Sequence, residues 1–368
     1  MIDAIGFGTI GMGMIAQTHL IGMQVNRVAH PDDICAHPRA LCTRRPDCAA
    51  GLPYEMCYTD PYELIADENV QVVDICTPND LHVPVATAAL RAGKAVYIEK
   101  PISHRLDEAE SLYALAEQTG LPTQTALIMR FRPDVNCIKD MLRAGAIGEA
   151  IHFRACFYHG SYLNPKRPTS WRQTLAQAGG GAMLDLGIHM MDLLRYLLED
   201  DIVDVTAQMR TVNKQRFTDE TCCDTVANDT DEYACAMLTL SRGAVGMIES
   251  SRVSASALGN EYFEIFGSKG SLLLRLDAGG GVWMTAPDGI SSRVPQSATP
   301  GEYEASLLPF LPGPRQSMGS FMDAHAAAIH NLTAIVAGHP SFLGTPDFAE
   351  GLYAQRLVAS CMDNAKWS

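Results

Sequence analysis

The stretch AIGFGTIGMGMIA, residues 4–16, decides how the N-terminal part of the chain is interpreted. Its apolar start predicts a strand over Ala4–Ile10 that turns directly into a helix. Gly11 permits a tight turn, Gly13 lets the backbone approach a pyrophosphate, and Ala16 is small enough for helix and strand to pack closely. A glycine-rich turn between a strand and a helix is typical of dinucleotide binding.

The first residues of this helix complete the expected phosphate site. Met14 and Ile15 follow the turn, where unpaired N–H groups of a helix N-terminus would face the anion. A second register of the motif starts at Gly6, but it leaves only residues 1–5 to form the first strand. We therefore prefer the register that starts at Gly11.

The chain up to about residue 126 alternates short apolar runs with helical patterns. This alternation predicts βαβ units and a doubly wound parallel sheet, an α/β Rossmann domain over residues 1–126. Gly93 and Gly120 follow the two clearest helices and would supply their left-handed C-terminal residues. The further predicted elements are strands at Ala40–Arg44, Val70–Cys76, Ala95–Ile98 and Thr123–Leu127, and helices at His82–Ala92 and Leu106–Thr119.

The pattern changes after residue 127, where one strong helix signal at Ala178–Leu198 is followed mostly by strands. An α+β domain with an open antiparallel sheet is predicted over residues 127–345. The sequence predicts a loop over Ser297–Pro314 and helices over Phe321–Ala337 and Phe348–Asn364. The C-terminal segment, residues 346–368, could pack back on the first domain. The predicted strands are Ala150–His159, Val203–Val212, Asp231–Leu240, Ala244–Arg252, Glu261–Phe266, Ser271–Leu276 and Val282–Thr285.

Composition narrows the class of protein. The 368 residues are 47% hydrophobic, which supplies cores for two domains at about 150 residues each. A net charge of -14 would repel nucleic acid and anionic lipid, so neither is an expected partner. No apolar run reaches about 18 residues, so no membrane span is expected.

The cysteines predict a reducing compartment. There are 11 of them without any C-x-x-C spacing, and the N-terminus lacks the pattern of a secretory signal, so we expect a cytoplasmic protein. Cys35, His37, Cys42 and Cys48 lie close together but match no zinc spacing. No metal site is expected from the sequence.

The end of the second predicted strand bears on the choice of cofactor. A carboxylate there would bind the ribose 2′-hydroxyl of NAD, whereas cations would bind the 2′-phosphate of NADP. Thr43 and Arg44 stand at this position, which favours NADP. Asp32 and Asp33 lie nearer the usual spacing of about 20 residues, although His30-Pro31-Asp32-Asp33 looks more like a turn. NAD therefore remains the alternative.

Two loops of the first domain carry polar residues beyond predicted strand ends, where ligands bind in open α/β sheets. Thr77, Pro78, Asn79 and His82 follow the third strand, and Glu99-Lys100-Pro101 follows the fourth. The peptide bond before Pro101 is a candidate for the cis form.

A third segment, GGGAMLDLGIHMMD at residues 179–192, places Asp185 and His189 four residues apart on one face of the predicted helix. The carboxylate could orient the imidazole and stabilise its protonated form, as a general base requires. Asp192 is a further candidate partner.

Together these segments resemble the Gfo/Idh/MocA family of oxidoreductases over nearly the whole chain. The features that carry the resemblance are the glycine-rich turn followed by His19, Thr77-Pro78-Asn79 with His82, Glu99-Lys100-Pro101, Arg130-Phe131-Arg132-Pro133, Trp171-Arg172, and the glycine run through Asp185 and His189. The resemblance implies that Lys100, Asp185 and His189 are catalytic. It also implies a homo-oligomer, a dimer or tetramer, formed through the open sheet. Gly22–Pro38, a long segment before the second strand, departs from the family pattern.

The implied reaction is hydride transfer between a nicotinamide and a secondary hydroxyl or ketone of a sugar, polyol or inositol. His189 would take the hydroxyl proton and Lys100 would polarise the same oxygen. The substrate is expected to contact Arg132, Lys166, Trp171 and Arg172 as well. Two alternatives remain open at this point, namely a glycosidase with a retained nicotinamide and a non-catalytic sensor of sugar or cofactor on the same fold.

Overall fold

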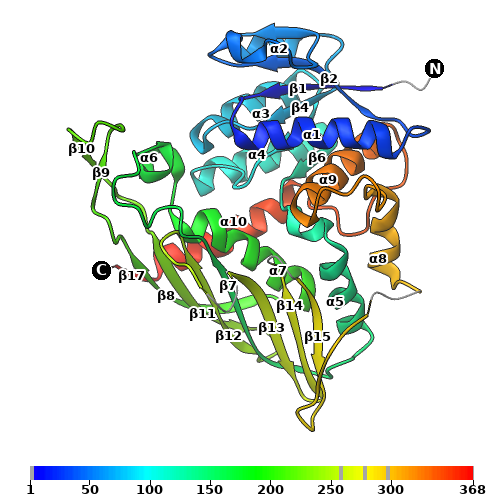
Figure 1. Cartoon of the computed structure of the whole chain (residues 1–368), viewed down its shortest axis with the longest axis vertical. Helices are drawn as coiled ribbons and strands as arrows, with labels where there is room; N and C mark the ends of the chain where they lie inside the picture. The colour runs from blue at the N-terminus through cyan, green and yellow to red at the C-terminus, as the bar shows by residue number, and fades with distance from the viewer. Residues whose placement is uncertain (1–3, 257–259, 277–279, 296–298, 368) are drawn as a thin grey trace. The chain divides into compact units, whose positions relative to one another are not determined.

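A computed structural model describes residues 4–256, 260–276, 280–295 and 299–367 of the chain (Figure 1). The chain divides into two compact units. The first comprises residues 1–133 and 303–352, and the second comprises residues 134–302 and 353–368. Residues 303–345, which the sequence placed in the second domain, thus belong to the first unit. The C-terminal helix is shared between the two.

The first unit contains a six-stranded sheet in which all strands are parallel, in the order β3-β2-β1-β4-β5-β6. The order reverses between β1 and β4, so this is the doubly wound sheet that the alternating pattern predicts. Its strands are β1 Ile5–Ile10, β2 Ala36–Cys42, β3 Met56–Tyr58, β4 Val72–Ile75, β5 Ala95–Ile98 and β6 Thr123–Thr125. The sequence missed β3 and began β2 four residues late.

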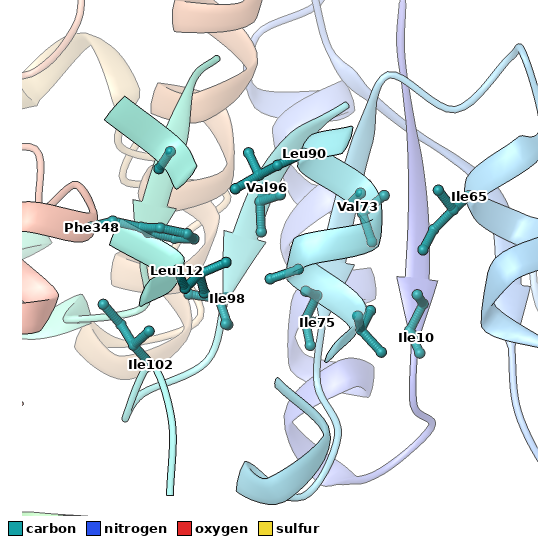
Figure 2. Close-up of a cluster of buried hydrophobic side chains, with 14 of the residues drawn as sticks. Ile10, Ile65, Val73, Ile75, Leu90, Val96, Ile98, Ile102, Leu112 and Phe348 are labelled. Atoms are coloured by element: carbon teal, nitrogen blue, oxygen red, sulfur yellow. The ribbon is translucent and has the colours of Figure 1, made fainter. Parts of the chain in front are cut away.

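Helices cover both faces of this sheet, and alternate residues of each strand point to opposite faces. Val96 and Ile98 of β5 pack with Leu90 and Leu112 on one face, where Figure 2 also shows Phe348. Ala95 and Tyr97 lie in a second cluster with residues of α1 and α9. The helices are α1 Met14–Ala29, α2 Pro61–Ala66, α3 His82–Arg91, α4 Leu106–Thr119 and α9 Ser320–Val336.

Two glycines end helices as the sequence predicts. Gly120 follows α4 with φ of 62°, and Gly93 follows the C-cap of α3 with φ of 77°. A side chain would strain this left-handed conformation, so glycine fixes where each chain segment turns back to the sheet.

The second unit contains a nine-stranded sheet in the order β16-β15-β14-β13-β7-β12-β11-β8-β17. Most neighbours are antiparallel, as the sequence predicts, while β12 pairs with β7 and β17 pairs with β8 in parallel. Its strands are β7 Ala150–Tyr158, β8 Ile202–Arg210, β11 Tyr233–Leu240, β12 Val245–Ser251, β13 Glu261–Gly267, β14 Gly270–Arg275, β15 Gly281–Thr285, β16 Ser291–Arg293 and β17 Ala365–Trp367. A separate hairpin consists of β9 Gln215–Phe217 and β10 Thr225–Ala227.

The predicted single helix over Ala178–Leu198 is wrong in its first part. The short α6, Leu175–Ala178, ends at Gly179 with φ of 78°; the chain then forms a π-helical turn, Met183–Gly187, before α7, Ile188–Leu198. The glycines at 179–181 break the helical pattern because they are poor helix formers. Asp185 therefore lies on a π-turn and His189 on an α-helix.

The remaining helices are α5 Pro133–Arg143, α8 Glu302–Leu307 and α10 Phe348–Asp363. The interval Ser297–Pro314, predicted to be a loop, contains α8 and a 3₁₀ turn at Leu308–Phe310. The buried Leu307 and Phe310 supply the apolar contacts that order it. Residues 297 and 298 lie outside the described part of the chain.

Across the described residues, every helix is too short or too polar to cross a lipid bilayer.

Candidate functional site

The glycine-rich turn joins β1 to α1 and is shaped by close backbone contacts. Gly11 has φ of 104°, its N–H donates to the carbonyl of Cys42 (3.0 Å), and a Cβ here would meet the carbonyl oxygen of Cys76 at 2.5 Å. Gly13 is the N-cap of α1, and a Cβ on it would meet nothing within 4 Å. Gly6 lies inside β1, so the βα turn corresponds to the register that starts at Gly11.

The position expected for the cofactor ribose follows β2 directly. Thr43 is buried, and its Oγ1 accepts the N–H of Arg45 (3.2 Å), while the Arg44 side chain is exposed. β2 runs parallel to β1, so Thr43 lies at the same sheet edge as the glycine-rich turn. Asp32 and Asp33 precede β2 and therefore lie at the opposite edge.

The turn after β4 holds the Thr77-Pro78-Asn79 segment. The Thr77 hydroxyl oxygen is buried without a hydrogen-bond partner among the described residues, and Asn79 begins a 3₁₀ turn. His82 is fully buried, with Nδ1 2.8 Å from the Pro101 carbonyl oxygen and Nε2 3.1 Å from that of Thr77. Both ring nitrogens of His82 thus face backbone carbonyls, so this residue links two loops and leaves no ring nitrogen for a ligand.

A buried cluster of titratable groups lies beside the carboxyl ends of β4 and β5. His19 of α1 has Nδ1 2.9 Å from Oδ1 of Asp74, and Nε2 3.3 Å from Oε1 of Glu99. Thr9 donates its hydroxyl to the other oxygen of Asp74 (3.1 Å). The imidazole therefore stands between two carboxylates in the protein interior.

This placement determines the charge of the ring. Burial alone would lower the pKa of His19, but Cys76 and the Asp74 carboxylate outweigh it and hold the pKa well above its ordinary value. Burial raises the pKa of the Cys76 thiol, and the neighbouring Asp74 raises it further. Burial would likewise raise the pKa of Glu99, yet His19, whose Nε2 is 3.3 Å from Oε1, lowers it to about 2. These shifts favour the protonated form of His19 between the two carboxyl groups.

His325 of α9 lies on the other side of this cluster. Its ring centroid is 5.2 Å from that of His19, and both its nitrogens are buried without hydrogen-bond partners among the described residues. Burial and the charge of His19 lower the pKa of His325 to about 3, so it is neutral. Tyr97 of β5 stacks on His19 at 5.1 Å.

Lys100 follows Glu99 at the carboxyl end of β5, and the Lys100–Pro101 peptide bond is cis. Its side chain is partly exposed. Its positive charge contributes to the low pKa values of Glu99 and His325, so it acts on the buried cluster. The ammonium therefore stands at the edge of the sheet where ligands of this fold bind.

These features fit a dinucleotide. The open space at Gly13 and the N-terminus of α1 would accept a pyrophosphate, and the buried Thr77 hydroxyl offers an unused polar atom at the neighbouring strand end. Met14 is strongly exposed and Ile15 half-buried in the first turn of α1.

In the second unit, a buried carboxylate organises the glycine run. Asp231 accepts the N–H of Gly181 (2.7 Å) and of Met183 (2.8 Å) through its two side-chain oxygens. A Cβ on Gly181 would lie 1.8 Å from the Asp231 carbonyl oxygen, so only glycine fits. These contacts fix the start of the π-turn that carries Asp185.

Asp185 is paired with an arginine that the sequence did not single out. Oδ2 of Asp185 accepts from Nε (3.2 Å) and Nη2 (2.9 Å) of the buried Arg252, whose Nη1 donates to the carbonyl of Arg172 (3.2 Å). His189 is buried, and its ring lies 5.8 Å from that of Phe157. The sequence expected Asp185 to serve the histidine; the partner observed at its Oδ2 is Arg252.

His159, at the end of β7, belongs to the same neighbourhood. Burial lowers its pKa, the charge of Asp185 opposes this, and the charge of Arg252 reinforces it, so the pKa is below its ordinary value. Ser161 donates its hydroxyl to Nδ1 of His159 (2.5 Å). The sequence could not identify Arg252 or His159, because each lies far along the chain from Asp185 and in no motif.

The other expected substrate residues are not gathered in one unit. Arg132 is buried and falls in the first unit, whereas Lys166, Trp171 and Arg172 belong to the second. The Arg172 guanidinium lies 4.4 Å from the Trp171 ring, and Lys166 is exposed.

Family models match both units. Residues 5–126 match the oxidoreductase family with an NAD-binding Rossmann fold, and residues 135–273 match the GFO/IDH/MocA C-terminal domain. The chain belongs to this family. It is therefore an oxidoreductase of the GFO/IDH/MocA family with an NAD-binding Rossmann domain.

Named relatives of this GFO/IDH/MocA oxidoreductase include sugar and inositol dehydrogenases. It is 28% identical over 286 residues to the levoglucosan dehydrogenase of Pseudarthrobacter phenanthrenivorans, covering 73% of each chain. It is 28% identical over 266 residues to scyllo-inositol 2-dehydrogenase (NAD(+)) of Bacillus subtilis, covering 72% of each. A solved levoglucosan dehydrogenase in complex with NADH and levoglucosan superposes with a TM-score of 0.86 at 25% identity, covering 98% of this chain and 97% of the other.

Proposed function

We propose that this oxidoreductase transfers a hydride between a nicotinamide and a secondary hydroxyl or ketone of a cyclic sugar or polyol. The observation that carries the proposal is Lys100, an ammonium placed by β5 at the nucleotide-binding edge of the sheet next to a charged buried cluster. Relatives named for levoglucosan and scyllo-inositol support a ring-shaped polyol as the substrate class.

The roles of the three proposed catalytic residues follow from their chemistry. Lys100 would donate hydrogen bonds to the reacting oxygen and stabilise negative charge on it. His189 would accept the hydroxyl proton, and Asp185, held by Arg252, would fix the π-turn from which the histidine helix starts. A bound nicotinamide would supply the hydride acceptor or donor.

We propose that NADP is preferred over NAD. Thr43 offers a hydroxyl at the end of β2, and the exposed Arg44 next to it offers a guanidinium fork suited to a 2′-phosphate. Asp32 and Asp33 lie before β2, which leaves the ribose edge of the sheet without either of these carboxylates.

A spectrophotometric screen of sugars, inositols and anhydrosugars with each cofactor separately tests the activity. With the best substrate, Lys100→Ala and His189→Ala should each lower kcat by roughly 10²- to 10⁴-fold, because each removes a group that acts on the transferred proton or its oxygen. Cofactor binding, followed by fluorescence, should persist in His189→Ala.

Unchanged turnover in both variants would contradict the catalytic assignment. Binding of sugar without turnover in the wild type would favour a sensor. Release of a free aglycone without net formation of reduced cofactor would favour a glycosidase.

Arg44→Gln tests the cofactor preference. The variant should raise KM for NADP by about ten- to a hundredfold, since a charge-assisted hydrogen bond contributes about 1.5–3 kcal/mol. KM for NAD should change little. Equal effects on both cofactors, or none on either, would contradict a 2′-phosphate contact.

We also propose a homo-oligomer formed through the nine-stranded sheet. Five large apolar side chains remain exposed on its strands, Ile151, Val203, Met237, Val245 and Trp367. Exposed apolar side chains that gather in one patch mark interaction surfaces. Light scattering measures the mass in solution, and a monomer would contradict the proposal.

A further inference from the structure

Two histidines and an aspartate lie close together at the C-terminal end of α1. This end is about 24 Å, the length of the helix, from the glycine-rich turn. His30 is the C-cap of α1, Asp33 lies in the turn that follows, and His330 belongs to α9. Oδ2 of Asp33 is 3.7 Å from Nδ1 of His30 and 3.5 Å from Nε2 of His330. The two imidazole rings lie 4.2 Å apart between centroids.

The local sequence holds this arrangement in place. His30-Pro31-Asp32-Asp33 forms the turn that the sequence predicts, closed by the N–H of Asp33 donating to the His30 carbonyl (3.2 Å). The Cys35 thiol donates to the carbonyls of His30 (3.5 Å) and Asp33 (3.4 Å). The turn therefore brings its first and last side chains to the same side.

α9 contacts α1 one helical turn before His330 in α9 and one turn before His30 in α1. Nδ2 of Asn26 donates to the Ala326 carbonyl (2.7 Å), and a Cβ on Gly22 would meet Ala326 at 3.2 Å. Asn26 precedes His30 by four residues, as Ala326 precedes His330. The helix contact therefore sets the position of the third side chain relative to the turn.

The distances suit a metal ion better than direct hydrogen bonds. Zinc binds imidazole nitrogen at about 2.0–2.1 Å and carboxylate oxygen at about 2.0–2.2 Å, so tetrahedral ligands stand roughly 3.3–3.5 Å apart. The spacings from Asp33 to His330 and His30, 3.5 and 3.7 Å, lie close to this separation. All three candidate ligand atoms lie within 4.8 Å of one another.

The site is also accessible to an ion. The Asp33 side chain is 54% exposed, which gives an ion a route from solvent.

The ring nitrogens that would not bind the ion are buried. Nε2 of His30 and Nδ1 of His330 have no hydrogen-bond partner among the described residues. The Phe310 ring also contacts His330 edge-on at 5.5 Å between centroids.

We propose that His30, Asp33 and His330 form a three-ligand Zn²⁺ site, with water as the remaining ligand, that ties the α1–β2 turn to α9. Two imidazoles and a carboxylate are the donors that zinc takes in three-ligand protein sites. The site is independent of the proposed dehydrogenase activity. It uses part of the long segment Gly22–Pro38, which departs from the family pattern and which the proposed reaction does not explain.

Metal binding by the full, untagged chain tests the proposal. Equilibrium dialysis against Zn²⁺ alone measures stoichiometry and affinity, and Co²⁺ reports geometry through its visible absorption. We compare the wild type with Asp33→Asn and His330→Gln. His339→Gln, an exposed histidine beyond the end of α9, is the matched control, and His325→Gln removes a ligand from a cluster at His19 that could also hold an ion.

The expected result is one Zn²⁺ per chain, with affinity lowered at least tenfold in Asp33→Asn and in His330→Gln and unchanged in both control variants. Co²⁺ should give tetrahedral bands without a sulfur charge-transfer band. Zn²⁺ should raise the Tm of the wild type but not of Asp33→Asn, because an ion that binds only the folded state stabilises it.

The proposal is overturned if the wild type binds no stoichiometric Zn²⁺, if binding survives in both site variants, or if His325→Gln or thiolate coordination accounts for it. Asp33 lies on a half-exposed turn, so Asp33→Asn should fold. Its circular dichroism spectrum and Tm without metal verify this.

Discussion

The two units each place a histidine beside a carboxylate, and they leave it in opposite charge states. In the first unit, His19 lies between Asp74 and Glu99, and the pKa of the ring is raised. In the second unit, His159 lies near Asp185, but the buried Arg252 binds that carboxylate and the pKa of His159 is lowered.

The difference teaches that a neighbouring carboxylate does not by itself determine the protonation of a buried histidine. What counts is burial together with the charge of all neighbours. At His19, Cys76 and Asp74 outweigh burial and raise the pKa, whereas at His159 burial is the largest cause of the lowered pKa and the charge of Arg252 adds to it. The predictions below remove these partners one at a time.

The largest effect is expected from Arg252→Met. Arg252 is 2% exposed and its partner Asp185 is 21% exposed, so the substitution removes an ion pair from the protein interior. The free energy of unfolding should fall by about 3 kcal/mol, measured by urea denaturation. The pKa of His159 should rise, because the charge of Arg252, one of the causes that lower it, is removed; NMR titration measures this.

Arg154→Met is the control for Arg252→Met. Arg154 pairs with Glu264 across neighbouring strands, but its side chain is 55% exposed, so its loss should cost at most about 1 kcal/mol. Similar losses in the two variants would show that burial does not distinguish these pairs.

A smaller effect is expected from His19→Gln, which removes the imidazolium between Asp74 and Glu99. The free energy of unfolding should fall by about 1.5–3 kcal/mol at neutral pH, since hydrogen bonds to charged groups are lost. The raised pKa of His19 stabilises the wild type fully below about pH 6.5, and this contribution is lost as pH rises through the raised value.

In His19→Gln that alkaline loss of stability should be absent, which denaturation at several pH values would show. ¹⁵N-histidine NMR should find His19 doubly protonated at neutral pH in the wild type. A singly protonated ring would contradict the charge assignment. His37→Gln, which removes a partly exposed imidazole beside Glu55, should leave stability nearly unchanged.

The smallest effect at neutral pH concerns His325, the neutral neighbour of His19. An unfolded histidine takes up a proton below about pH 6.5, whereas folded His325 stays neutral down to about pH 3. The unfolded state thus binds more protons, and stability falls with falling pH in this window by up to about 1.4 kcal/mol per pH unit.

In His325→Gln the free energy of unfolding should depend less steeply on pH between about 6.5 and 4.5, because unfolding takes up one proton fewer. Urea denaturation of the nucleotide-free protein at several pH values would show this. His330, His30 and His159, whose pKa values are also lowered, remain in both proteins and contribute to the remaining slope. Identical slopes in the two proteins would mean that His325 is not kept neutral by burial.

Local sequence patterns predicted the elements of the first unit closely, but not those that depend on distant contacts. β5 and α4 match their predicted bounds, because strong apolar periodicity and a following glycine define them. The π-turn at Met183–Gly187 was missed, since Asp231 and its hydrogen bonds to Gly181 and Met183 come from 50 residues away. The helix at Glu302–Leu307 was missed because Pro and Gly around it suggested a loop.

The sequence by itself determined the Rossmann sheet, the position of the glycine-rich turn and the family, because each is set by a local pattern of apolar residues and glycines. Only the tertiary structure decided the charge states and the pairing of Asp185 with Arg252. It also placed His330 beside His30, 300 positions earlier in the chain. The physical reason is that pKa values and ion pairs depend on burial and on neighbours in space, and packing brings these together irrespective of their order in the chain.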